Sequence, residues 1–132
     1  MVDVWQPTSD AGNAPDLTVL KTLASQSDAL QQGQPLATIN DSELASARSW
    51  IQLSEAAWQE SIQQLTDQER LQLATFYTVA EVKLSGWQAR DKNPAIWIFR
   101  YLKKNGQLPE KEFIKALKSQ TDNRFIPYGS VL

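Results

Sequence analysis

Two signals for the start of a helix constrain the fold of this chain more than any other feature of its sequence. Asn40 stands three residues before Glu43, and Thr66 stands three residues before Glu69. At this spacing each side chain can bond the other residue's backbone N–H, an arrangement known as a capping box. The sequence therefore predicts two helices, which begin just after Asn40 and just after Thr66.

Apolar residues recur at intervals of three and four behind these signals, which is the period of one helical face. Asn93-Pro94 is a further start signal, because proline suits the first turn of a helix. In the helix that follows Thr66, Leu71 and Val82 lie opposite the main apolar face, so we expect this helix at the centre of the fold. The predicted helices cover about 15–32, 41–64, 67–84, 94–104 and 109–120.

These helices predict an all-α fold, a compact bundle of four to five helices with a structured aromatic C-terminal tail. The chain has 132 residues, of which 42% are hydrophobic. That is enough to build one core without disulfides or metals. We expect a single helical domain over residues 15–132, preceded by a loosely structured N-terminal arm over residues 1–14.

The chain contains neither histidine nor cysteine, and this narrows its chemistry. Histidine is the commonest general base and metal ligand, and cysteine is the usual thiol nucleophile. The five glycines form no phosphate-binding loop of the Walker or dinucleotide type. We therefore expect a non-enzymatic protein with no catalytic residues, no cofactor and no metal site.

Glu81 is the one acidic residue in an unusual position, because it lies among the apolar residues of the predicted helix 67–84. A buried carboxyl group here would either be functional, holding a proton or a cation, or pair with a basic group from the next helix. We favour the pairing, because structural ion pairs also occupy such positions.

Charge is spread unevenly along the chain. Residues 1–66 hold two basic residues against eight acidic ones, a net charge of −6, whereas residues 67–132 hold eleven against seven, a net +4. Such asymmetry indicates either an acidic or nucleic-acid partner for the basic half, or two halves that attract each other within one fold. We favour attraction within the fold.

Basic residues are most concentrated from Lys83 onward, where ten of them stand against four acidic residues. The predicted helices 94–104 and 109–120, with a glycine-containing turn between them, have the outline of a helix-turn-helix. Basic charge on one face is what phosphate contact requires. However, Glu110 and Glu112 would repel phosphates, and lysines on an outer helical face usually contact only solvent. The candidate binding surface consists of Arg100, Lys103, Lys104, Lys111, Lys115, Lys118, Arg124, Phe125 and Tyr128.

The last residues, 121–132, are unusually apolar for the end of a chain. Phe125, Ile126 and Tyr128 would cap an open end of the bundle, which is the interpretation we favour. Two others remain. The closing Ser-Val-Leu has the form of a C-terminal motif that sheet-edge peptide binders accept, and the tail could dock on a second copy of the chain.

These observations favour a small protein-interaction or regulatory protein, whose partner is another protein or a second copy of itself. The alternative is a nucleic-acid-binding module that uses the basic C-terminal half. The sequence shows no signal peptide and no stretch long enough to span a membrane, so we expect a cytoplasmic protein without a membrane partner.

Overall fold

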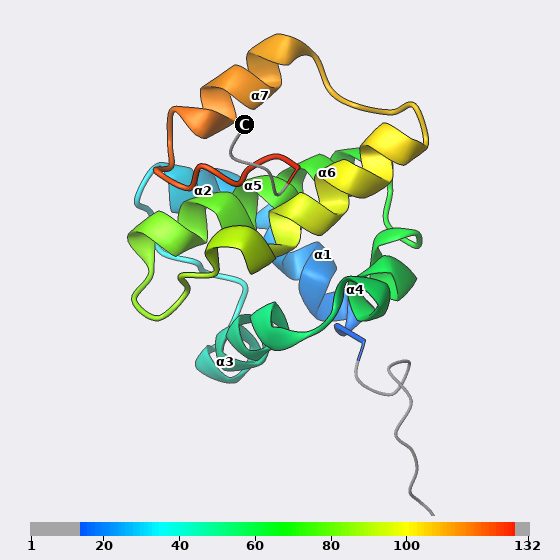
Figure 1. Cartoon of the computed structure of the whole chain (residues 1–132). Helices are drawn as coiled ribbons and strands as arrows, with labels where there is room; N and C mark the ends of the chain where they lie inside the picture. The colour runs from blue at the N-terminus through cyan, green and yellow to red at the C-terminus, as the bar shows by residue number, and fades with distance from the viewer. Residues whose placement is uncertain (1–13, 129–132) are drawn as a thin grey trace, which may run out of the picture.

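Every regular element is a helix in the computed structural model, which describes residues 14–128 (Figure 1). Seven α-helices occur in this range: α1 (Leu17–Ser25), α2 (Ser27–Gln31), α3 (Asp41–Ser49), α4 (Glu55–Ile62), α5 (Asp67–Lys83), α6 (Pro94–Lys104) and α7 (Lys111–Lys118). Two short 3-10 helices, η2 (Trp50–Gln52) and η3 (Arg90–Lys92), lie between them. The predicted all-α class is confirmed, whereas the predicted number of four to five helices is wrong.

The count differs because two of the predicted helices are each broken in two. The first breaks at Gln26, next to Ser25, whose hydroxyl donates to the Thr22 carbonyl (2.6 Å). Serine side chains that bond nearby backbone compete in this way with the helical ladder. The periodic spacing of apolar residues continues across the break, so the sequence pattern does not reveal it.

The second break follows η2, where Leu53 is extended and Ser54 starts a new helix. The Ser54 hydroxyl accepts a hydrogen bond from the Ala57 N–H (3.2 Å), which caps α4. The bend also lets the Trp58 indole N–H donate to the Trp50 carbonyl (2.9 Å). Packing of Trp58 therefore contributes to a corner that replaces the single long helix predicted over residues 41–64.

Three of the five predicted helix starts are confirmed, whereas the first helix begins at Leu17 instead of Pro15, because Asp16 is its cap. Both capping boxes are present, with reciprocal bonds between Asn40 and Glu43 and between Thr66 and Glu69. Asn93 caps α6, and proline occupies the first turn. The last helix begins at residue 111, slightly later than predicted.

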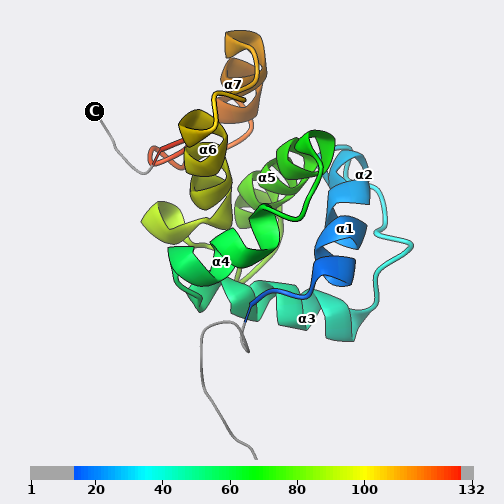
Figure 2. The same cartoon turned by 90° about the vertical axis from the view of Figure 1, so that its right-hand side faces the viewer.

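Helix α5 is the centre of the fold, with α1 and α2 on one side and α6 on the other (Figures 1 and 2). Its buried residues run without interruption from Leu73 to Glu81. Val82 departs from the prediction, because it is 50% exposed instead of facing a second apolar neighbour. The largest fully buried side chains are those of Trp58, Tyr77, Phe76 and Phe99.

Arg70 joins three helices through a nearly buried guanidinium group. It donates to the carbonyls of Ile62 (2.9 Å) and Gln63 (3.0 Å), which lie at the C-terminal end of α4. The same group stacks 4.6 Å from the ring centre of Tyr101 on α6. Because unpaired helix-end carbonyls are costly to bury, Arg70 stabilises the corner between α4 and α5.

Helix α7 lies at the opposite end of the molecule from α3, and the tail that follows it returns to contact α6 (Figures 1 and 2). On α7 only Leu117 is buried, and Phe113 and Ile114 are half-buried against the core. In the tail, Ile126 is buried and Tyr128 is half-buried. Of the tail residues predicted to cap the bundle, Ile126 is thus buried, whereas Phe125 and Tyr128 are only partly covered.

Two other predictions concern residues outside the described range. The proposed C-terminal motif falls on residues 130–132, and almost all of the predicted N-terminal arm falls on residues 1–13. Among the described helices, none combines the length and the apolar character that crossing a membrane requires.

Candidate functional site

The two basic helices are not arranged as a compact helix-turn-helix. Residues 105–110 join α6 to α7, a longer link than the roughly three- to four-residue turn of that motif. The tail also contacts both helices, because the Tyr128 carbonyl is bonded from α6 and the Ile126 carbonyl from α7. The structure thus departs from the helix-turn-helix outline that the sequence indicates.

Three of the predicted binding residues hold the tail in place. Arg100 donates from Nε to the Tyr128 carbonyl (3.0 Å), and the Lys103 ammonium lies 4.6 Å from the Tyr128 ring centre. Lys118 donates from Nζ to the Ile126 carbonyl (2.7 Å). These three cations therefore stabilise the tail. The sequence pattern cannot distinguish such a structural role from a role in binding.

The other four basic residues of the predicted surface are exposed. Within the described residues, the side chains of Lys104, Lys111, Lys115 and Arg124 make no hydrogen bond or ion pair. Phe125, the remaining aromatic member, is half-buried and packs against the core. The structure therefore divides the predicted surface into a part that holds the tail and a part that faces solvent.

The charge asymmetry is compensated only slightly by direct contacts within the fold. Among the ion pairs of residues 14–128, only Arg100–Glu55 (3.1 Å) joins the basic half of the chain to the acidic half. The others, Arg70–Asp67, Arg90–Glu81 and Arg90–Asp122, lie within the basic half. Attraction between the halves, the interpretation favoured from sequence, is thus represented by a single direct pair.

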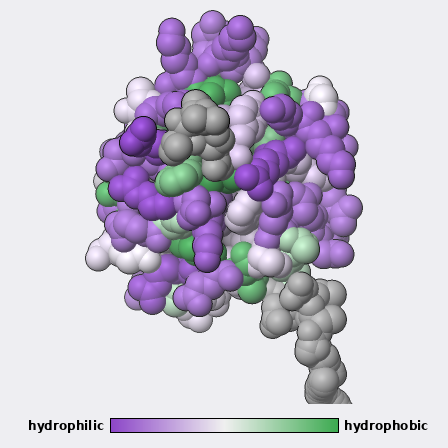
Figure 3. Space-filling model, viewed as in Figure 1, coloured by the Kyte–Doolittle hydropathy of each residue, from purple (hydrophilic) through white to green (hydrophobic). Residues whose placement is uncertain are grey.

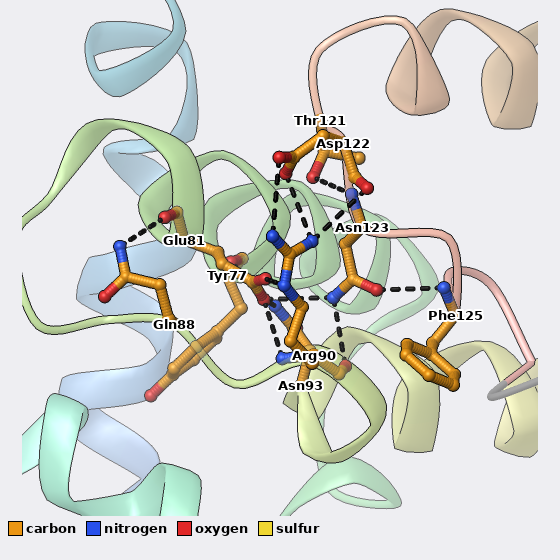
Figure 4. A network of polar contacts seen from close by, with 9 residues as sticks. All are labelled: Tyr77, Glu81, Gln88, Arg90, Asn93, Thr121, Asp122, Asn123 and Phe125. Atoms are coloured by element: carbon orange, nitrogen blue, oxygen red, sulfur yellow. Dashed lines mark hydrogen bonds and ion pairs between the residues drawn. The ribbon is translucent and has the colours of Figure 1, made fainter.

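Glu81 forms the centre of a buried polar cluster (Figure 4). The residue is only 3% exposed. Its Oε1 accepts hydrogen bonds from Asn93 Nδ2 (2.9 Å), Asn123 Nδ2 (3.0 Å) and the Arg90 backbone N–H (3.2 Å). One carboxylate therefore ties α5 to η3, to the start of α6 and to the tail.

Arg90 is the basic partner of this carboxylate. Its Nε lies 3.5 Å from Glu81 Oε2, and its guanidinium also pairs with Asp122 (3.2 Å). The predicted pairing of Glu81 is confirmed, although the partner lies on η3 rather than on the next α-helix. Arg90 has a φ of 50°, an uncommon conformation for a residue with a side chain. The Arg90 carbonyl accepts from Asn123 (2.9 Å), which helps to hold this conformation.

The cluster includes two asparagines that the sequence does not mark as candidates. From the sequence, Asn93 is predicted only to cap a helix. In the structure its Oδ1 caps α6, and its Nδ2 also donates to Glu81 and to the Tyr77 carbonyl (3.1 Å). Asn123 donates to Glu81 and accepts from the Phe125 N–H (2.9 Å). The only sequence signals for this arrangement are the acidic Glu81 among apolar residues and the capping residue Asn93 nearby.

The arrangement around Glu81 is suited to holding segments together. The donors that reach the carboxylate come from η3, from the residue that caps α6 and from the tail. Within residues 14–128, no group of three or more acidic, histidine or cysteine side chains is placed to hold a metal ion.

Two hollows lie along one side of α5. The first, of about 270 Å³, lies between α2, α5 and α7 and has Leu71, Phe113 and Leu117 in its lining. The second, of about 520 Å³, is lined by Glu81, Val82, Gln88 and Arg90 together with residues 119–122. Gln120 lines both hollows. We call the two together the α5–α7 furrow.

Val82 gives the furrow the most exposed large apolar side chain of residues 14–128. Val82 is 50% exposed and Leu108 is 39% exposed, and only Val82 lines the furrow. On the face seen in Figure 3, hydrophilic residues predominate and apolar ones form small separate areas. The sequence does not predict the furrow, because its pattern indicates an interior position for Val82.

The comparisons with known proteins give no relative: the chain shows no significant match to a protein-family model, to a curated protein or to a solved structure.

Proposed function

We propose that this is a non-enzymatic protein that binds another protein through the α5–α7 furrow. The observation that carries the proposal is the exposure of Val82 in a hollow that shares Gln120 with a second hollow, which has further apolar side chains in its lining. Exposed apolar surface in a hollow is a common feature of protein-binding sites. Binding would cover Val82 and the exposed parts of Leu71 and Phe113.

The state of Glu81 supports the non-enzymatic part of the proposal. A general acid or base must reach a substrate, directly or through water. The hydrogen bonds that Glu81 accepts come instead from its own chain and all reach Oε1, and the bond from Asn123 joins the tail to α5.

The test is a pull-down from the native lysate with an N-terminal tag, with and without nuclease. We expect a protein partner that survives nuclease, is lost with Val82→Lys and is retained with Leu108→Lys. Leu108 is a matched control, because it is the other exposed large apolar residue of residues 14–128 but lies outside the furrow lining. Retention of the partner by Val82→Lys would contradict binding through the furrow.

A second candidate is nucleic-acid binding by Lys104, Lys111, Lys115 and Arg124. It is favoured by the positive charge of residues 67–132, because only one ion pair of the described residues joins this half to the acidic half. Phosphate binding weakens steeply with salt, whereas apolar docking does not. Anisotropy of a labelled DNA duplex, measured at rising salt with the wild type and with Lys111→Gln/Lys115→Gln, would reveal it. Equal anisotropy with and without protein would contradict it.

A further inference from the structure

We infer that the α5–α7 furrow takes an extended, uncharged peptide segment that places one apolar side chain in each hollow. This inference rests on the proposed function and specifies the partner's chemistry. It follows from the polar rim of the furrow, from its charges and from its length.

The rim of the furrow is rich in amide side chains. Five glutamines from α2, α5 and two connecting segments line the two hollows: Gln31, Gln68, Gln72, Gln88 and Gln120. The side chains of Gln68, Gln72 and Gln120 make no hydrogen bond to the described residues, whereas Gln88 donates to the Glu81 carbonyl (3.1 Å).

These amides match an extended chain better than a helix. A glutamine side chain offers both donors and an acceptor. An extended segment has backbone N–H and C=O groups that need partners, whereas a helix satisfies most of its own. The rim therefore favours a partner whose backbone is available for hydrogen bonding.

The charges of the furrow favour an uncharged segment. Glu81, Arg90 and Asp122 are paired with one another in the second hollow. Asp28, the only charged residue in the lining of the first hollow, is exposed to solvent. A charged partner side chain would thus lose hydration without gaining a buried counter-charge.

The distance along α5 sets the spacing of the apolar side chains. Leu71 and Val82 are eleven positions apart, which corresponds to about 16 Å along a helix at about 1.5 Å per residue. An extended chain covers that distance in about five residues. Side chains on one face of an extended chain alternate, so the two anchors should be about four or six residues apart.

The test is selection from a displayed library of random peptides, about twelve residues long, against the full chain immobilised through its N-terminus. That length covers the furrow with a margin at each end. We expect enriched peptides with few charges and with two apolar residues about four or six positions apart. A synthetic copy should bind at least about tenfold more weakly to Val82→Lys and about threefold more weakly to Gln72→Ala, which loses one hydrogen bond. Binding to Leu108→Lys should be unchanged.

Any of the following results would overturn this inference: no enriched peptide, enriched peptides that are charged or have helical apolar spacing, or binding insensitive to Val82→Lys. The pull-down distinguishes these failures from failure of the proposed function. If Val82→Lys abolishes capture of the lysate partner while the peptide selection fails, the furrow binds protein but not an extended uncharged segment. If Val82→Lys leaves capture intact, the proposed function itself is wrong.

Discussion

The α5–α6 region and the α7–tail region are held by different kinds of interaction. Helices α5 and α6 are covered by apolar side chains, and Phe76, Ile98 and Phe99 are fully buried. Helix α7 buries only Leu117, and the tail adds to the buried Ile126 directional bonds such as the one from Asn123 to Glu81. Apolar burial is spread over many contacts, whereas a polar cluster can be lost through one bond. We therefore expect the C-terminal region to open more readily than the core.

This difference bears on the furrow, because the furrow lies between the two regions. One wall is α5, and the other is formed by α7 and residues 119–122. The bonds of Asn123 and Asp122 to the Glu81–Arg90 pair fix the second wall. The polar cluster thus determines the shape of the proposed binding site.

Removing a core side chain should have the largest effect. Phe99→Ala deletes a fully buried ring and should reduce the free energy of unfolding by about 3–5 kcal/mol. Leu108→Ala, at a position that is 39% exposed, should have a much smaller effect. Urea denaturation measures both, and similar losses for the two variants would contradict the assignment of Phe99 to the core.

Removing the tail should have a smaller effect. Deletion of residues 122–132 removes the buried side chain of Ile126, worth about 1.5–3 kcal/mol, and the Asn123 bond to Glu81. We expect the melting temperature to fall by several degrees, with most of the helical circular dichroism signal retained. An unchanged melting temperature would show that the tail does not stabilise the fold.

The smallest expected effect concerns the buried phenol of Tyr77, which changes the free energy of unfolding only at alkaline pH. Burial raises the pKa of the Tyr77 phenol well above its ordinary value of 10.0. Above about pH 10 the unfolded chain loses this proton while the folded chain keeps it, so stability is complete below that pH and falls as pH rises. The loss should be about 1.4 kcal/mol per pH unit.

Tyr77→Phe provides the control for this pH dependence. It lacks the hydroxyl that donates to the Ala47 carbonyl (2.8 Å), so it should be less stable by about 1 kcal/mol at neutral pH. Its stability should fall less steeply than that of the wild type above about pH 10 when both are measured by urea denaturation. Parallel curves would contradict the raised pKa.

The parts of the fold that could be predicted from the sequence are those that depend on local signals. The capping residues Asn40 and Thr66 act on their own helices, so their effect can be read from neighbouring positions. The corner at Ser54 could not be predicted, because Trp58 and Trp50 meet through tertiary packing and the apolar period continues across the corner. Tertiary contacts often override local periodicity in this way.

The site was less predictable than the fold. The sequence marks Glu81 as unusual and predicts a basic partner, but Asn123 lies 42 positions away and carries no signal. The basic residues can be recognised from composition, yet composition cannot show that Arg100 and Lys118 bond tail carbonyls. Long-range polar contacts depend on the completed fold, and the spacing of residues in the sequence does not encode them directly.

Native-state hydrogen exchange tests most directly the claim that the α7–tail region is held separately by the polar cluster. We expect amides of α7 to exchange about a hundredfold faster than those of Leu73 to Ala80 in α5. Asn123→Ala should further increase the exchange rate of the α7 amides and leave that of the α5 amides unchanged. Arg124→Ala, at the exposed neighbouring position, should change neither rate. Equal exchange of α7 and α5, or equal acceleration of both by Asn123→Ala, would show instead that the molecule opens as one unit.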